Sequence, residues 1–325
     1  MRLARALVLG VGGLILALAA TRADNYPSRR ITLIAPWPAA GAIDTLCRQL
    51  APGIADRLGQ PVIVENRPGA GSTIGTADVA RASPDGYTLV MAGSGSLAIS
   101  PTLYKKLPYD PRQDFSPVAS IAEIPFVLVV NPSLPIQSAT DLIKYAKEHP
   151  GTLTYASGGA GSPHHLYAEL FKSMTGVEMT HVPYKGNTPA LTDVIAGHVS
   201  LMFADALALP MVRSGKVRAL GVSSLTRLPS APDIPPLAEV GVPGFNAAGW
   251  GMIVAPAHTP APIVHKLYVA ITAVETQAEI RDHIIQLGLT PKAGVAPDQL
   301  QGFINSEMER WGKVVQTAGL AGTQE

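Results

Sequence analysis

The chain of 325 residues has one cysteine, few aromatic residues and no cluster of basic residues. One cysteine cannot form an internal disulfide or supply a cysteine-ligated zinc centre. Charged residues make up only 15% of the chain, with 25 Lys and Arg against 24 Asp and Glu. This sparse, even charge excludes a nucleic-acid-binding surface. Hydrophobic residues make up 47%, which excludes disorder for most of the chain and allows two domains with ample cores.

Long hydrophobic runs are also absent, except at the N-terminus. Two arginines precede an uninterrupted apolar stretch over residues 6–20, in which Ala17 and Ala19 are spaced as in a cleavage site. This pattern predicts a secretory signal peptide over residues 1–23, because about 15 apolar residues are short for a membrane span. An uncleaved anchor is the alternative. We expect an exported, periplasmic protein whose mature form carries a formal charge of about −2.

The rest of the chain alternates between short apolar strands and amphipathic helices. The pattern first predicts strands at 31–35, 62–64 and 88–91, separated by helices at 43–58 and 73–81. A second block has strands at 126–130, 154–156, 181–183, 201–203 and 219–222, with helices at 139–148, 165–174 and 188–196. The tail has helices at 262–275 and 297–315. The alternating order implies right-handed crossovers and mostly parallel sheets flanked by helices.

Loops rich in Pro, Gly and Asp at residues 107–117 and 228–243 bracket the second block. We therefore predict an α/β protein of two lobes. Lobe 1 consists of residues 24–124 plus 228–325, and lobe 2 of residues 125–227. The chain crosses between such lobes twice, which suits hinge motion, and clefts between domains are favoured ligand sites.

Three loops at the carboxyl ends of predicted strands are suited to binding an anion. PWPAAGAID (36–44) lies between the first strand and the first helix, where open α/β sheets bind ligands. Its small residues and the helix N-terminus favour a negatively charged group. AGSGS (92–96) and SGGAGS (157–162) follow later strands and offer backbone N–H and hydroxyl donors. Ordinary turn chemistry is the alternative for each of the three loops.

Motifs of enzymes are scarce. The sequence has no GxSxG nucleophile elbow, no HExxH zinc motif and no phosphate-binding loop. GAGSTIG (69–75) is similar to a dinucleotide-binding fingerprint, but an Arg-Pro pair interrupts the turn and no acidic residue ends the next strand. For the adjacent His164 and His165, a helix-start or core role fits better than metal binding. Cys47 lies at a core-facing helical position, so we expect it to be buried. We expect no catalytic residue, metal or cofactor.

Several motifs together resemble a known family. In chain order they are PWPAAGAID (36–44), ENRPGAGS (65–72), PDGYTL (84–89), LPYD (107–110), YASG (155–158), HVPYKG (181–186), SGKVRAL (214–220), PGF (243–245) and Trp250. They cover essentially the whole mature chain and resemble the tripartite tricarboxylate transporter receptors, often called Bug receptors.

The resemblance implies a two-lobed receptor that closes on a small organic carboxylate and delivers it to the permease subunits of a tripartite tricarboxylate transporter. In such receptors the loop after the first strand and the Ser/Gly loops of both lobes hold the carboxylates through backbone amides, hydroxyls and ordered water. The ligand-binding positions that match by resemblance and position are Trp37, Ala40, Gly41, Asp44, Ser94, Ser96, Ser157, Gly161, Ser162, Tyr184, Lys185 and Asp205.

The chain departs from the family pattern in two places. Ala40 stands where a glycine is usual, and its methyl group could narrow the pocket or change the preference among ligands. The His164-His165 pair stands where one histidine is usual. We expect a monomer. Two other functions stay open: a sensory or scaffold protein that uses the same ligand-binding module, and an exported hydrolase. Aliphatic di- or tricarboxylates, amino acids and aromatic acids all fit such loops.

Overall fold

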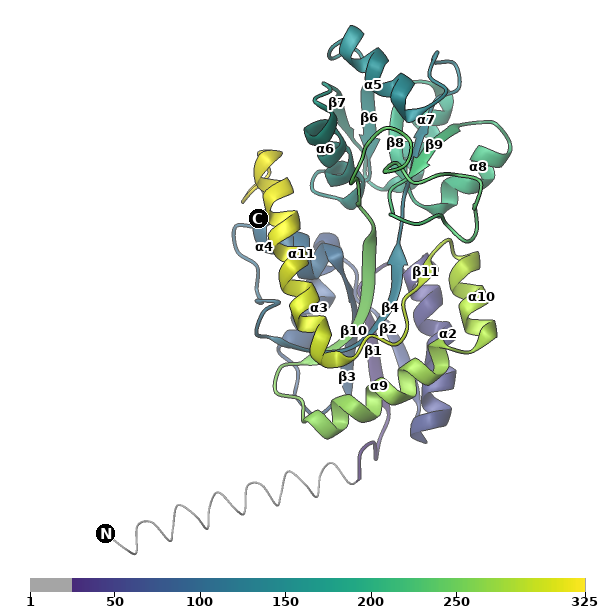
Figure 1. Cartoon of the computed structure of the whole chain (residues 1–325). Coiled ribbons are helices and arrows are strands. Elements are labelled where there is room, and N and C mark those ends of the chain that lie inside the picture. Colours follow the sequence, from purple (N-terminus) through teal and green to yellow (C-terminus); the bar gives the residue numbers. More distant parts are fainter. Residues whose placement is uncertain (1–24, 325) are drawn as a thin grey trace, which may run out of the picture.

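The computed structural model describes residues 25–324, so the predicted signal peptide lies outside the described residues. Two separate β-sheets with helices around them lie one beyond the other along the length of the molecule (Figure 1). We call the six-stranded sheet with its helices lobe 1, and the five-stranded sheet with its helices lobe 2. This arrangement confirms the predicted two-lobed α/β fold.

The sheet of lobe 1 has the strand order β11-β4-β10-β3-β1-β2. Its strands are β1 (Ile31–Ala35), β2 (Val62–Asn66), β3 (Thr88–Gly93), β4 (Phe115–Ile124), β10 (Gly249–Pro256) and β11 (Thr290–Pro291). β1 pairs in parallel with both β2 and β3, as the alternation of strands and helices predicts. β10 pairs antiparallel with β3 and β4, and β11 pairs antiparallel with β4.

The sheet of lobe 2 has the strand order β7-β6-β8-β5-β9. Its strands are β5 (Val127–Val130), β6 (Thr154–Ser157), β7 (Thr180–Pro183), β8 (Leu201–Ala204) and β9 (Arg218–Val222). β6 is parallel to its neighbours β7 and β8, whereas β5 is antiparallel to β8 and β9. Both sheets are therefore mixed, and the expectation of mostly parallel sheets is corrected. The sequence pattern shows where a strand lies but not its direction.

Helices cover both faces of each sheet and bury the side chains that recur at helical spacing. They are α2 (Ala42–Leu58), α3 (Thr73–Ala80), α4 (Ser100–Leu103), α5 (Ala139–Glu148), α6 (Pro163–Thr175), α7 (Asn187–Ala196), α8 (Leu209–Arg213), α9 (Ala261–Glu275), α10 (Ala278–Gln286) and α11 (Pro297–Thr317). Cys47 is fully buried on α2, as predicted. Within residues 25–324, no helix is long and apolar enough to span a membrane.

One hydrophobic core is continuous between the lobes. α11 packs against β4 and α4 of lobe 1 and also contacts α6 of lobe 2. At this junction the ring of Trp311 stacks on that of Tyr167, with centroids 5.3 Å apart. The indoles of Trp250 and Trp311 both donate hydrogen bonds to Glu307 Oε2. α11 therefore braces the two crossings of the chain between the lobes.

The segment between β9 and β10, residues 223–248, packs on lobe 2. Val222 of β9 donates a hydrogen bond to the carbonyl of Pro235 and accepts one from the N–H of Leu237. The ring of Phe245 stacks on that of Phe203 in β8, with centroids 5.7 Å apart. We therefore propose moving the predicted lobe boundary at residues 227 and 228 to the start of β10. The predicted loop at 107–117 likewise overlaps β4, which begins at Phe115.

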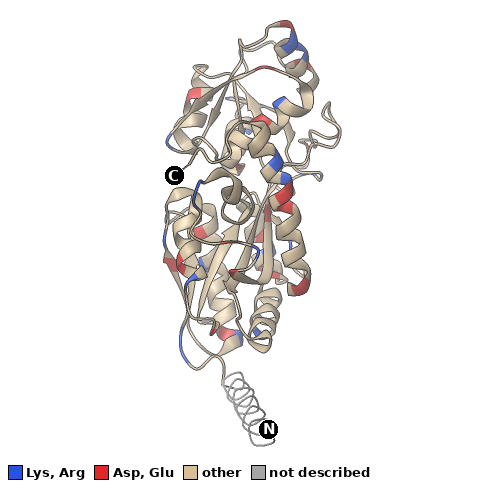
Figure 2. Cartoon of the chain, turned by 90° about the vertical axis from the view of Figure 1, so that its left-hand side faces the viewer, with Lys and Arg blue, Asp and Glu red and all other residues tan. Residues whose placement is uncertain are grey.

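Charged side chains are few and of mixed sign over both lobes (Figure 2). A ligand of high charge would therefore not be attracted by the field of the whole molecule, and local donors must bind it.

Candidate functional site

Asp44 organises the loop between β1 and α2. Its side chain is 3% exposed. It accepts hydrogen bonds from the N–H of Ala40 at 2.8 Å, from Arg48 Nε at 3.1 Å and from Asn66 Nδ2 at 2.8 Å. Burial raises the pKa of this carboxyl, but these hydrogen bonds outweigh burial, so the pKa lies below its usual value. Asp44 is therefore ionised, and it fixes the loop through its hydrogen bond to the backbone of Ala40.

The loop that Asp44 fixes presents backbone amides. Ala40 has a left-handed backbone with φ of 64°, which turns the chain into the N-cap residue Gly41. Among the described residues no side chain caps this end of α2. The first turn of a helix leaves N–H groups without partners and carries a partial positive charge. Residues 39–42 are exposed, and only the N–H of Ala40 is bound by Asp44, so the helix start faces the side from which a ligand could approach.

Trp37 and Ser94 lie beside this loop, on lobe 1. The Trp37 ring packs close to Gly93, where an added Cβ would be 3.7 Å from Cη2 of the indole. Ser94 follows Gly93 at the end of β3, and its side chain forms no hydrogen bond to residues 25–324. Ser96, in contrast, is fully buried, with its hydroxyl 3.4 Å from the backbone of Gly93. We interpret Ser96 as part of the turn.

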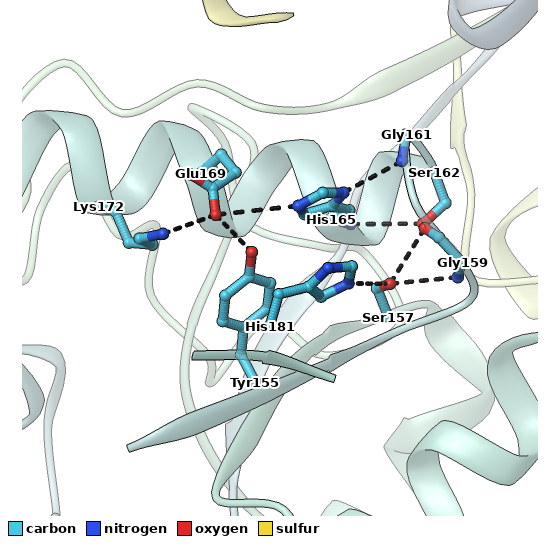
Figure 3. A network of polar contacts seen from close by, with 9 residues as sticks. All are labelled: Tyr155, Ser157, Gly159, Gly161, Ser162, His165, Glu169, Lys172 and His181. Carbon is cyan, nitrogen blue, oxygen red and sulfur yellow. Dashed lines mark hydrogen bonds and ion pairs between the residues drawn. The ribbon is translucent and has the colours of Figure 1, made fainter. Parts of the chain in front are cut away.

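The loop after β6 is shaped by its own hydroxyl groups (Figure 3). Ser157 Oγ lies 2.6 Å from His181 Nε2 and accepts a hydrogen bond from the N–H of Gly159. Ser162 is the N-cap of α6, and its hydroxyl donates to the carbonyl of Gly159 at 2.7 Å. The Ser157 and Ser162 hydroxyls thus hold the loop, and its backbone amides are the groups left for a ligand.

Two stacked imidazoles, one from α6 and one from β7, lie beside this loop (Figure 3). The rings of His165 and His181 have centroids 3.7 Å apart, and His165 Nδ1 accepts the N–H of Gly161 at 3.1 Å. Burial lowers the pKa of His165 to about 4 and also lowers that of His181. Both rings are neutral near pH 7, so His165 can accept this hydrogen bond. On the side of the pair away from the loop, Lys172 Nζ lies 2.7 Å from Glu169 Oε1 (Figure 3).

The lobes touch at two places on either side of the loops. A Cβ added to Gly161 would lie 2.5 Å from Leu103 of α4, and the φ of 75° at this residue also requires glycine. On the other side, a Cβ added to Gly288 would lie 1.8 Å from the Cβ of Ala206. Gly161 is therefore a point of contact between the lobes as well as a loop residue.

The remaining predicted positions lie on lobe 2. The Tyr184 hydroxyl donates a hydrogen bond of 2.6 Å to Asp193 Oδ2, which fixes this side chain against α7. Lys185 is exposed. Asp205 accepts a hydrogen bond from Asn187 Nδ2 at 2.5 Å, at the start of α7. A Cβ added to Gly158 would lie 3.6 Å from the backbone N of Asn187, so the loop after β6 adjoins this helix start.

His164 and Tyr167 also reach this region, one turn apart on α6, and sequence analysis did not include them in the site. Both rings pack edge-on against Phe126, at 4.8 and 4.9 Å. Both nitrogens of His164 are buried without a hydrogen-bond partner in the described chain, and burial lowers its pKa to about 4. The sequence did draw attention to His164, because the chain has two adjacent histidines where the family pattern has one.

Metal binding has no support in this geometry. Among residues 25–324, no group of three or more His, Cys, Asp or Glu side chains is arranged to hold a metal ion. The Ser157–His181 pair has the spacing of a nucleophile and its base, but Ser157 is 0% exposed. A substrate carbonyl cannot approach a hydroxyl in that position.

Comparison with known proteins identifies the family. Residues 46–320 match the model of the tripartite tricarboxylate transporter family receptor. The chain belongs to this family. A curated relative, the protein BugT of Bordetella pertussis, is 39% identical over 319 residues, which span 96% of this chain and 97% of BugT. The family therefore covers the chain almost from end to end, as the motifs predict.

Two solved structures of Rhodopseudomonas palustris proteins are similar to this tripartite tricarboxylate transporter receptor. Rpa4515 with adipate is 38% identical, with a TM-score of 0.80, and the match covers 91% of this chain and 99% of that one. MatC with bound malate is 34% identical, with a TM-score of 0.76, covering 89% of this chain and all of MatC. Both neighbours hold small carboxylates, and the family consists of solute-binding receptors.

Proposed function

We propose that this protein is an exported, periplasmic receptor that captures a small organic carboxylate between its two lobes and delivers it to the permease of a tripartite tricarboxylate transporter. The observation that carries the proposal is the loop after β1, where Asp44 fixes an exposed turn that leads into the uncapped start of α2. Relatives of the same fold bind adipate and malate.

The chemistry of the loops fits a carboxylate. Backbone N–H groups and hydroxyls bind an anion without burying a bare cation, which limits the cost of removing charges from water. Two carboxylates beside the loops are already paired with cations, Asp44 with Arg48 and Glu169 with Lys172. The ligand's charge is then balanced by dipoles that the fold holds in place. We further propose that the protein acts as a monomer and has no catalytic activity.

Ligand binding can be tested by the shift in thermal unfolding of the mature protein against a panel of carboxylates. A ligand that binds only the folded state stabilises it, by roughly 2.7 kcal/mol at a hundredfold excess over its Kd. We expect a shift with aliphatic di- or tricarboxylates and none with matched amides, which lack the charge. A well-folded protein that no carboxylate stabilises would contradict the receptor proposal.

Delivery to the permease needs a separate test. Deleting the gene for this protein while the permease stays intact should abolish uptake of the ligand found in the panel. Normal uptake in that strain would favour a sensory or scaffold role for the same module.

A further inference from the structure

A leucine of lobe 1 packs against a glycine in the ligand loop of lobe 2. Leu103 is the last residue of α4, and Gly161 lies in the loop between β6 and α6. An ideal Cβ on Gly161 would lie 2.5 Å from Cδ2, 3.0 Å from Cδ1 and 3.2 Å from Cγ of Leu103. The leucine side chain therefore lies directly on the glycine backbone, and no larger residue fits between the two lobes here.

The C-terminal tail (318–324) fixes the end of α4 that carries Leu103. The N–H of Gly322 donates to the carbonyl of Thr102 at 3.0 Å. The N–H of Gln324 donates to the carbonyl of Leu103 at 3.2 Å, and a parallel bridge joins the two segments. The tail thus binds the last two carbonyls of α4, which a helix leaves without partners at its end.

Gly161 is also fixed from within lobe 2. Its N–H donates to His165 Nδ1 at 3.1 Å, and its φ of 75° is one that residues with a side chain rarely adopt. Ser162, the N-cap of α6, follows directly. A shift of Gly161 would therefore move the backbone amides that this loop presents to a ligand.

Leu103 is connected as well to the ligand loop of its own lobe. Ser94, after β3, leads into a π-helical turn (Gly95–Ile99) that continues directly into α4. Turns of this kind are rare and often occur at functional sites. A continuous helical segment therefore joins the loop after β3 to the contact with the loop after β6.

We propose that Leu103, fixed by the C-terminal tail, is a positioning residue that keeps the loop after β6 in its ligand-binding form from the opposite lobe. This inference rests on the proposed receptor function and deepens it. Leu103 is 5% exposed, so it acts through Gly161 rather than by touching the ligand. The tail then influences ligand affinity without being part of the site.

The first test needs no ligand and measures amide hydrogen exchange of the protein purified after export. Leu103→Ala uncovers Gly161, so exchange in a peptide covering residues 157–166 should become several-fold faster. Exchange in the loop after β1 should keep its wild-type rate. Leu103→Met keeps the volume of the side chain and should restore the wild-type protection.

Calorimetric titration with adipate, malate and citrate then measures binding. In Leu103→Ala, the affinity for each acid that binds the wild type should fall about tenfold, because the ligand must then order the loop itself. Leu103→Met should bind as wild type does. Leu267→Ala is the control for stability: it truncates a fully buried leucine of α9 in a separate core cluster of lobe 1. It should lower the unfolding temperature but change neither affinity nor loop exchange.

A substitution in the tail tests the tail itself. Gly322→Pro removes the N–H that binds Thr102, and proline cannot adopt the φ of 64° at this position. The affinity should fall about threefold, as for one lost hydrogen bond. Gly215→Pro is the matched control on the exposed surface of lobe 2. It removes an N–H that donates to Val212 at 3.0 Å, at a φ of 70°, and should bind as wild type does.

The outcomes separate this inference from the proposed function. Unchanged loop exchange in Leu103→Ala would overturn the positioning role and leave the carboxylate receptor intact. Faster exchange with wild-type affinity would also overturn it, because the contact would then be structural only. An equal loss of affinity in Leu267→Ala would assign the effect to the stability of lobe 1. Wild-type affinity in Gly322→Pro would refute the role of the tail. A wild-type protein that binds no carboxylate would contradict the proposed function and the positioning role with it.

Discussion

The loop after β1 and the loop after β6 occupy comparable places in the two lobes, each between a strand with parallel neighbours and a helix, but different chemistry holds them. An ionised carboxylate, Asp44, fixes the first loop with help from Arg48 and Asn66. Neutral imidazoles and hydroxyls fix the second, and the charges of Glu169 and Lys172 lie behind them. In both loops the nearby carboxylate is paired with a cation. The two loops should nevertheless respond differently to acid, because only the loop after β6 depends on neutral imidazoles.

Acid should have the largest effect, and it should act on lobe 2. Burial, with His181 stacked beside it, lowers the pKa of His165 from 6.5 to about 4, against the opposing effect of Glu169. The unfolded chain takes up this proton near pH 6.5 and the folded chain only near pH 4. His165 alone should therefore lower the free energy of unfolding by about 3 kcal/mol as the pH falls between these values, and buried His164, whose pKa is also lowered to about 4, should add to this loss. Urea unfolding across this range measures it.

Variants can assign the acid effect to the stacked pair. His181→Phe keeps an aromatic ring in the stack and removes one of the two charges, so its stability should depend less on pH. His149→Gln changes an exposed histidine at the end of α5 and should keep the wild-type profile. If His181→Phe loses stability in acid as steeply as wild type, His181 does not contribute, and the loss comes from the burial of His164 and His165.

Removing the Asp44 carboxylate, which holds the loop after β1, should have the next largest effect. Asp44→Ala leaves Arg48, Asn66 and the N–H of Ala40 without their acceptor. Hydrogen bonds to a charged group contribute about 2 kcal/mol, so we expect a loss of that order in both the free energy of unfolding and ligand binding. Urea unfolding and calorimetric titration measure the two losses.

The exposed Asp56 on the same helix provides the control for Asp44. Asp56→Ala makes the same change at the far end of α2, away from the loop, and should leave binding unchanged. Unchanged binding in Asp44→Ala would mean that the loop after β1 does not contact the ligand.

The sequence predicted the strands and helices with a clear period but not the two crossing strands. β4 contains Pro117, which argues against a strand, and in the structure this residue sits beside an irregularity in the pairing with β10 where its missing N–H is tolerated. β10 is buried on both faces, so it shows no alternation of polar and apolar residues. The directions of β5 and β10 depend on packing between distant segments.

The candidate site was predictable where it depends on local chemistry. Small residues at the ends of β1, β3 and β6 indicated the loops, and the structure places Asp44 and Ser162 as loop-holding groups. The burial of Ser96 and the Tyr184–Asp193 hydrogen bond were not predictable, because they depend on how each side chain turns. The packing of the His164 and Tyr167 rings on Phe126 was not predictable either, because it depends on how α6 is turned against its neighbours.

The smallest effect should come from backbone strain, in which the two loops also differ. The loop of lobe 2 has glycine at its positions of positive φ, Gly159 and Gly161, whereas the loop of lobe 1 has Ala40 at a φ of 64°. A residue with a side chain in this region costs about 1 kcal/mol relative to glycine. Ala40→Gly should therefore raise the free energy of unfolding by up to about 1 kcal/mol, measured in urea.

The neighbouring Ala39 offers a matched control, because it is equally exposed but has no positive φ. Ala39→Gly should destabilise the protein slightly, since glycine then only adds freedom to the unfolded chain. If the Ala40 methyl also narrows the pocket, Ala40→Gly should widen the range of acids that bind, and Ala39→Gly should not. Equal stability changes in the two variants would show that the backbone of Ala40 is not strained. The two loops would then differ only in the side chains that hold them, Asp44 in lobe 1 and His165 in lobe 2.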